Sequence, residues 1–485
     1  MRRNDGKMKF WNQYRTQKIQ NKKTHKCIYC GIVLAVIMTV VSCGKQGKTQ
    51  QQDVQQENGA DMTGMTQDSG AAQQGSFGSV LASYGVALPV SRPSIYVDVA
   101  GYVPGREKKV IFAGDSYGQT FDVVRSQDGE VVYTGVIPPG EIDPLSGQTL
   151  SVGDFSSFDE AGTYYIHTDI VGQSYSFEIA EDIYENLFLS MLKNISGAEL
   201  QDSPEGVCDV SFGMHVVMYA LQCNGTLFEA AYQHLDQSEQ DKQLVTQLLY
   251  MGKWLSSRQN SDGSLYHDYE ATAAFCGIMA MSWDMFGRYE ASVGREYQNA
   301  ADAAWKWLEK QPCETESEKN ARFYAAAQLF HTDGGAEFKT IAEEFLRVQG
   351  GDYSGERFVF YGVLAYISAE KGTDRDLGTY IMRDMVDRVE AICEDVKQDD
   401  VFGTGTRTVE DNMSSMLHLC FVNYLTPSKE YTMIIENTIQ YMGGLNEAGI
   451  CYMGADGAQV KSLEWRGILL LGMGDMIENI NELEK

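Results

Sequence analysis

The chain has 485 residues, enough for more than one folded domain, and its 67 acidic residues outnumber 39 lysines and arginines to give a formal net charge of −28. A surface of this sign repels polyanions, so the composition excludes nucleic acid as an expected partner. It is compatible with neutral or cationic ligands and does not choose between them.

The N-terminal segment predicts export. Residues 1–26 are rich in lysine and arginine, and residues 27–41 form an uncharged, mostly apolar run. The run is short for a membrane span and long enough for the core of a signal peptide. It ends in Val40-Val41-Ser42-Cys43, which resembles a bacterial lipoprotein cleavage box. We therefore expect residues 1–42 to be a signal peptide and Cys43 to carry the lipid, so that the body is extracytoplasmic and anchored to the bacterial membrane. The alternative is an uncleaved N-terminal anchor, which leaves the body on the same side.

Residues 43–90 are rich in Gln, Gly, Ser, Asp and Thr and poor in large apolar side chains. Such a segment buries too little apolar surface to offset the entropy lost on ordering. We expect a flexible tether between the lipid and the folded body.

Residues 91–181 are expected to form short strands. Apolar residues alternate over 95–99, a second apolar run covers 110–112, and the runs 121–124 and 131–133 flank the turn Asp128-Gly129. Residues 164–167 and 175–179 continue the pattern. Short strands at this spacing predict a small β-sandwich.

Three motifs in this segment resemble the immunoglobulin-like module that precedes the catalytic barrel in many family nine glycoside hydrolases, the cellulases and their relatives. They are residues 98–102 (Asp-Val-Ala-Gly-Tyr), 154–157 (Asp-Phe-Ser-Ser) and 161–164 (Ala-Gly-Thr-Tyr). The resemblance covers the whole segment and implies an immunoglobulin-like cellulase N-terminal module over residues 91–181.

From residue 182 to residue 485 apolar residues recur at three and four positions, which is typical of helices. We expect helices that start near residues 184, 210, 240, 269, 294, 318, 335, 356, 374, 409, 428 and 459. Twelve helices with short loops fit six hairpins closed into an (α/α)6 barrel, although periodicity alone also fits an open helical array. The closed barrel is what the family resemblance implies, through residues 254–259, 262–267, 301–308 and 412–446.

Residues 209–220 resemble the segment that opens the family's catalytic barrel, but they lack its two aspartates. The positions that match are Asp209, Val210, Ser211, Gly213 and His215. Val216 and Tyr219 stand where the resemblance implies the aspartates, and Val460 stands where it implies the proton-donating glutamate. Inverting hydrolysis needs a carboxylate base and a carboxylic acid, and neither valine nor tyrosine supplies that base near neutral pH.

Two further parts of the family's site are missing. The loop with His and Arg that grips the sugar is replaced by the sequence that follows Asn446, and the long insertion that builds a cleft wall is absent after His267. Base, acid, sugar-gripping loop and wall are therefore all lost or replaced, and we expect no catalytic residue at the family positions.

Four side chains remain as candidates for glycan contact, and each has a structural alternative. They are His215, Trp465, Glu464 and Glu270. His215 could instead be a buried histidine with satisfied hydrogen bonds, and Glu464 could be an ion-pair or capping partner of Lys461 or Arg466. Glu270 and Asp268 precede or begin a helix, where acids are favourable. Trp254, Trp283, Trp305 and Trp307 lie at helical spacing and are expected in the core.

No cofactor or metal is expected. Seven cysteines follow Cys43 and no pair has zinc-ligand spacing, although a disulfide such as Cys208–Cys223 remains open. No phosphate-binding loop or Ser-His-Asp order is present.

Two functions of different class fit these observations. The first is a surface lipoprotein with a family nine-like architecture that binds polysaccharide, such as a β-glucan, without hydrolysing it. The alternative is an active, cellulase-like glycoside hydrolase whose carboxylates have moved, with Glu270, Glu464 and Asp268 as substitutes. Because fold does not fix function, the positions of the carboxylates must decide between them.

Overall fold

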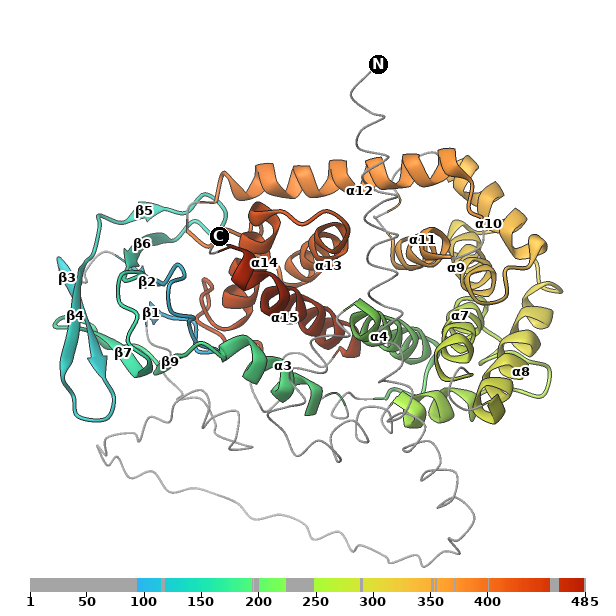
Figure 1. Cartoon of the computed structure of the whole chain (residues 1–485), viewed down its shortest axis with the longest axis horizontal. Helices are drawn as coiled ribbons and strands as arrows, with labels where there is room; N and C mark the ends of the chain where they lie inside the picture. Colours follow the sequence, from blue (N-terminus) through green and yellow to red (C-terminus); the bar gives the residue numbers. More distant parts are fainter. Residues whose placement is uncertain are drawn as a thin grey trace, which may run out of the picture.

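The computed structural model describes residues 94–114, 118–193, 195, 200–223, 248–287, 291–349, 353, 356–369, 372–399, 401–453 and 462–483. A β-sandwich and a helical domain lie side by side (Figure 1). Within the described residues, no helix is both long enough and apolar enough to span a membrane. Cys43 and Val460 lie outside the described residues.

The sandwich consists of two antiparallel sheets. One has the strand order β1-β2-β6-β5, and the other has the order β4-β3-β7-β8 with β9 also paired to β7. Phe112, Phe121, Phe155 and Phe177 are fully buried between them. The strands are β1 (Ile95–Tyr96), β2 (Lys109–Ala113), β3 (Thr120–Arg125), β4 (Val131–Val136), β5 (Glu141–Ile142), β6 (Thr149–Asp154), β7 (Gly162–Thr168), β8 (Gly172–Gln173) and β9 (Phe177–Ile179). The predicted β-sandwich is confirmed.

Only three residues separate the last strand, β9, from the first helix, α3. The helices that follow are α3 (Ile183–Lys193), α4 (Pro204–Cys223), α7 (Tyr269–Gly287), α8 (Ala291–Leu308), α9 (Glu316–Asp333), α10 (Ala336–Gln349), α11 (Arg357–Ser368), α12 (Arg375–Val396), α13 (Val409–Leu425), α14 (Lys429–Met442) and α15 (Leu463–Leu483). Residues 248–256 are also helical.

Alternate helices form the inner wall of a barrel. Helices α4, α7, α9, α11 and α13 are buried along most of their length, whereas α8, α10 and α12 bury one face. Helix α15 packs against both α4 and α13, and Phe360 of α11 meets His418 of α13 with ring centroids 4.6 Å apart. These contacts close the ring of inner helices, so the (α/α)6 barrel is confirmed and the open array is excluded.

Helix α4 corrects one sequence expectation and excludes one alternative that the sequence left open. The helix predicted near residue 210 begins at Pro204, because the Ser203 hydroxyl accepts a hydrogen bond from the Gly206 N–H (3.1 Å) and proline is well suited to the first helical position. Cys208 and Cys223 are free thiols on this one helix. Their spacing corresponds to roughly 22 Å along the axis, which excludes a disulfide between them.

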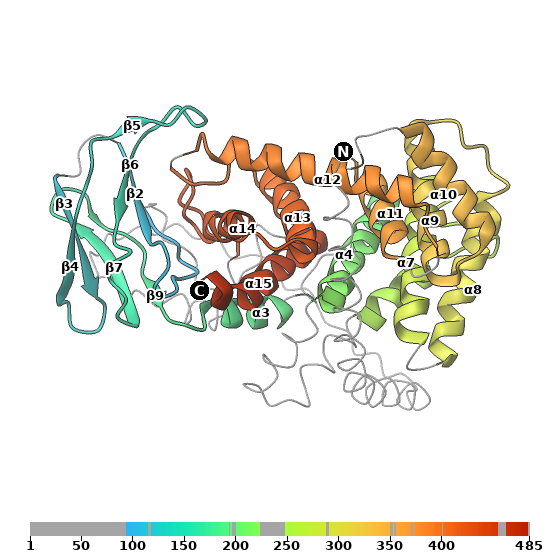
Figure 2. The same cartoon turned by 45° about the horizontal axis from the view of Figure 1, so that its top comes forward.

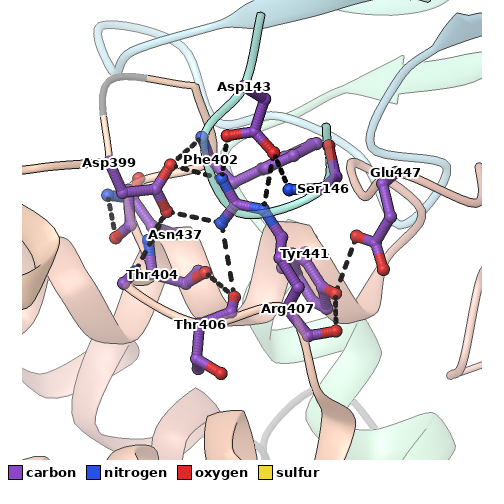
Figure 3. Close-up of polar contacts among 12 residues, drawn as sticks. Asp143, Ser146, Asp399, Phe402, Thr404, Thr406, Arg407, Asn437, Tyr441 and Glu447 are labelled. Carbon is purple, nitrogen blue, oxygen red and sulfur yellow. Dashed lines mark hydrogen bonds and ion pairs between the residues drawn. The ribbon is translucent and has the colours of Figure 1, made fainter. Parts of the chain in front are cut away.

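A buried ion-pair cluster joins the two modules (Figure 3). Arg407, in the loop between α12 and α13, lies 2.8 Å from Asp143 of the sandwich and 2.8 Å from Asp399 of its own loop. Its guanidinium stacks on Phe402, 4.4 Å from the ring centroid. Burial alone would raise the pKa of Asp399, but the hydrogen bonds and charge of Arg407 outweigh it and hold that pKa at about 2.

Helix α12 carries this loop to the sandwich, since it extends across the helical domain from α10 toward β5 in both views (Figures 1 and 2). A second set of contacts involves the middle of α14 and the residue that follows the helix. Glu436 forms an ion pair with Arg106 and accepts a hydrogen bond from the Tyr184 hydroxyl (2.9 Å), and the Val99 N–H donates to the Gly443 carbonyl (3.0 Å). We call these two sets of contacts together the seam.

Candidate functional site

The inner helices bring three charged side chains together at the end of the barrel where α11 and α15 begin. Arg357 is the first residue of α11, Glu464 is the second residue of α15, and Asp209 lies in the second turn of α4. One nitrogen of Arg357 donates to Asp209 (3.0 Å) and to Glu464 (2.6 Å). We call this cluster of Asp209, Arg357 and Glu464 the mouth.

Glu464 is held by side chains of α11. It is 8% exposed, and its second oxygen accepts a hydrogen bond from the Tyr361 hydroxyl (2.7 Å). Burial, and then the charge of Glu464, raise the pKa of Tyr361 well above its usual value, so the phenol remains a donor. The sequence predicts Lys461 or Arg466 as the partner of Glu464. Lys461 lies outside the described residues, and the ion pair that the structure shows joins Glu464 to Arg357 of α11.

Arg357 places two carboxylates opposite each other. Because the same nitrogen binds both, the two acceptor oxygens cannot be farther apart than the two hydrogen-bond lengths together. The guanidinium stacks over Phe212, 4.7 Å from the ring centroid, and 43% of its side chain remains exposed. Two carboxylates fixed on one cation suit the binding of hydroxyl groups, whereas proton transfer needs one carboxyl that is free to hold a proton and one that is free to take it.

His215 lies below this layer and has polar partners. It is 2% exposed, its Nδ1 is 3.2 Å from the Tyr324 hydroxyl and 3.3 Å from the Gln328 amide, and its ring packs 4.7 Å from that of Tyr361. Burial lowers the pKa of His215 to about 3, so the ring is neutral. His215 is therefore a buried histidine with polar partners, which is the alternative to a glycan contact. A ligand could reach it only if the neighbouring rings of Tyr324 and Tyr361 moved.

Val216 and Tyr219, which stand where the resemblance implies the two aspartates, carry no carboxylate. Val216 is 1% exposed and packs on Gly467 of α15, where an added Cβ would lie 2.9 Å from it. Tyr219 is half-buried, with its ring 6.5 Å from that of Phe421. Burial raises the pKa of Tyr219 well above its usual value, so it is a neutral phenol near pH 7.

The remaining candidates sit at helix starts. Asp268 caps α7 by accepting a hydrogen bond from the Ala271 N–H (2.8 Å), which is the structural role considered for it. Glu270 lies in the first turn of α7 and is half-buried, as is Trp465 in the first turn of α15. Burial, opposed by the charge of Arg357 and reinforced by Asp268, Glu270 and Asp209, raises the pKa of Cys208 to about 12. Asp268 and Glu270 therefore lie near the same part of α4 as Asp209 and Arg357 of the mouth.

Sequence reasoning missed Arg357 and Tyr361 and did not assign Asp209 a role. The available signals were the retained identity of Asp209 and the position of Arg357 at a predicted helix start. A helix start fixes where a residue enters the barrel but does not show which distant helix it faces.

The loop after Asn446 forms part of the contact between the barrel and the sandwich. The Asn446 side chain accepts hydrogen bonds from the Ala448 and Ile450 N–H groups (3.1 Å each), which fixes the turn. Gly449 has a positive φ of 58°, and an added Cβ there would lie 2.7 Å from the Tyr96 ring of β1. The segment after Asn446, which the family resemblance places at the sugar-gripping loop, packs against the sandwich in this structure.

Comparison with known proteins bears on both modules. Residues 90–173 match the family model of the cellulase N-terminal ig-like domain. The chain is 25% identical over 367 residues to Endoglucanase D of Acetivibrio thermocellus, an alignment that covers 57% of this chain and 58% of that protein. In both modules the chain is similar to family nine endoglucanases. Because the alignment covers 58% of Endoglucanase D, this chain spans less than two thirds of the length of that curated relative.

The solved structures of family nine proteins share the fold. A metagenome-derived family nine endoglucanase superposes with a TM-score of 0.65 at 16% identity, over 78% of this chain and 98% of that one. A Bacteroides ovatus family nine protein superposes with a TM-score of 0.62 at 14% identity, over 79% and 98%. At these identities the likeness shows architecture alone, and it agrees with the sandwich and barrel described above.

Proposed function

We propose that this chain is an extracytoplasmic glycan-binding protein on a family nine glycoside hydrolase scaffold, which holds a β-glucan-type polysaccharide at the mouth without hydrolysing it. The observation that carries the proposal is the bridging of Asp209 and Glu464 by Arg357. Val216 and Tyr219, at the described family base positions, offer no replacement for the base.

The chemistry of the mouth suits a sugar. Carboxylates accept hydrogen bonds from sugar hydroxyls, and the exposed part of the Arg357 guanidinium can donate to them. The curated relatives are named endoglucanases, and one family nine structure with the same fold is in complex with a cellobiose-like isofagomine. These names motivate a β-linked glucan as the first ligand to test.

The binding test compares substitutions at the mouth with a matched surface arginine. We expect Arg357→Met and Glu464→Gln to weaken retention of the purified chain in gels that contain mixed-linkage β-glucan or hydroxyethyl cellulose. Arg347→Met is the control, since Arg347 is 48% exposed, lies on α10 and pairs with Asp374. Equal retention of all three variants and the wild type would rule out the mouth as the binding site.

The second candidate is a hydrolase with relocated carboxylates, and the facing pair Asp209 and Glu464 is the observation that favours it. If the chain binds glycan without hydrolysing it, as we propose, the wild type should release no reducing sugar above the blank. Release that Asp209→Asn or Glu464→Gln abolishes would establish the hydrolase instead. Release that neither variant alters would point to a contaminating enzyme or to other carboxylates, such as Glu270 or Asp268.

Lipid attachment at Cys43 is part of the proposal. Its support is the basic start, the apolar run and the Val-Val-Ser-Cys sequence. Metabolic labelling with a radioactive fatty acid should mark the wild type and not Cys43→Ser. Label retained by the variant would refute this attachment site.

A further inference from the structure

Asp98 is a carboxyl group buried in the seam. It lies between β1 and β2, is 1% exposed, and its Oδ1 accepts a hydrogen bond from the Ala100 N–H (2.9 Å). Gly443, which follows α14, approaches so closely that an added Cβ would lie 1.9 Å from that oxygen. The carboxyl group is therefore enclosed between the sandwich and the barrel.

The groups that face Asp98 do not compensate a negative charge. Helix α14 contributes Glu436, which is itself a carboxylate, and α3 contributes the neutral phenol of Tyr184. The segment after β1 contributes Tyr102, whose hydroxyl accepts the Asp98 N–H (2.8 Å), and Arg106, which pairs with Glu436. Within the described residues Asp98 forms no ion pair, in contrast to Asp143 and Asp399 at the other end of the seam.

We propose that Asp98 makes the joint between the two modules sensitive to pH, because its carboxyl group is neutral while the seam is closed and its ionisation at higher pH loosens the seam. An isolated carboxylate is costly to bury, whereas the neutral acid is not. The contacts released first are the Val99–Gly443 hydrogen bond and the Tyr184–Glu436 hydrogen bond. The sandwich is then left attached through residues 180–182 and the Arg407 cluster.

The sign of the effect follows from linkage. Burial raises the pKa of Asp98 well above its value in the unfolded chain; hydrogen bonds from the Ala100 and Gly101 N–H groups oppose this shift, and the charge of Glu436 adds to it. The seam therefore has its full stability below the unfolded pKa, about 3.9. Above that pH the open form binds fewer protons than the closed form, so stability falls until the pH passes the folded pKa.

The test is amide hydrogen exchange of seam peptides (residues 95–103 and 439–446) between pH 4 and pH 8, corrected for intrinsic exchange. In the wild type we expect protection of these peptides to fall with pH, by up to about tenfold per unit. Asp98→Asn keeps the acceptor for the Ala100 N–H and cannot ionise, so its protection should not change with pH. Asp169→Asn, which removes an exposed carboxyl from the β7–β8 turn, should behave as the wild type.

The proposal would be overturned if protection of the seam peptides changed with pH in the same way in the wild type and in Asp98→Asn. It would also be overturned if protection of these peptides in the wild type stayed constant from pH 4 to pH 8. If Asp98→Asn does not fold, the wild type still decides: seam peptides must lose protection relative to the core peptide 321–330 of α9. The outcome does not depend on glycan binding, because no ligand enters the measurement.

Discussion

Gly443 allows the sandwich and the barrel to approach each other closely. Its neighbours across the seam are the Asp98 carboxyl oxygen, 1.9 Å from an added Cβ, and the Ala100 Cβ at 3.0 Å. A methyl group at this position would displace a buried side chain that is hydrogen-bonded to the backbone. The requirement is for space, because the φ of Gly443 is −76°.

We therefore predict that Gly443→Ala lowers the free energy of unfolding by about 1–3 kcal/mol, as overpacking does in a close-packed interior. Gly378→Ala is the matched control. It lies within α12 and nothing occupies the 4 Å around its added Cβ, so alanine should stabilise the helix by about 0.5–1 kcal/mol. Urea denaturation measures both changes, and equal effects of the two substitutions would contradict the prediction.

Glu464 illustrates what sequence can establish about a single residue. Its place at the start of a helix and its ion-pairing role followed from local pattern and charge. Its partner Arg357 is 107 positions away, and only the closed barrel brings the two together. Asp209 gained a role for the same reason.

At the scale of elements, the loop between α12 and α13 provides a buried ion-pair contact between the modules. Arg407 is enclosed by Asp143 and Asp399, whose side chains are 2% and 1% exposed. The Asp399 carboxylate also accepts hydrogen bonds from the Phe402, Thr404 and Gly405 N–H groups (Figure 3). The loop is thus organised around one carboxylate and one guanidinium.

We predict that Arg407→Met destabilises the chain by about 3–5 kcal/mol at pH 7, because it leaves two buried carboxylates without a counter-charge. The exposed pair Arg347–Asp374 is the control, and Arg347→Met should cost no more than about 1 kcal/mol. Chemical denaturation gives both values. A loss of similar size in the two variants would show that the buried cluster does not stabilise the seam.

The same cluster also predicts how stability changes at low pH. Arg407 lowers the folded pKa of Asp399 to about 2, so this stabilisation is present above the unfolded value near 3.9 and is lost as pH falls through 2. The difference in unfolding free energy between the wild type and Arg407→Met should therefore narrow as the pH falls from 4 to 2. A difference that stays constant over this range would argue against ionised carboxylates in the cluster.

At the scale of the whole molecule, we predict that the two modules stay attached as one unit at pH 7, because the short junction and the Arg407 cluster hold them even where ionisation of Asp98 loosens the other contacts of the seam. The junction between β9 and α3 spans only residues 180–182, and the seam holds ion pairs from both modules. Limited proteolysis at pH 7 should trim the Gln- and Gly-rich residues before about 85 and should spare the junction. An early cut near residue 180 would show that the modules move independently.

The fold could be predicted because its signals are local. Alternating residues predicted the strands, and three-to-four periodicity predicted the helices, with starts displaced by a few residues where a proline or a cap decided them, as at Pro204. The seam could not be predicted, since Asp143 and Arg407 are 264 positions apart and neither stands out in the sequence. Glu464 of the mouth could be singled out from the sequence, whereas the bridging Arg357 could not, because only the closed barrel brings these two residues together.

The position of the segment after Asn446 has a consequence for any redesign of that segment. In this chain it stabilises the joint between modules, with Gly449 fitted against Tyr96. A loop rebuilt there to contact a ligand would remove the packing of Gly449 on Tyr96, so a gain in binding at this point would cost contacts between the two modules.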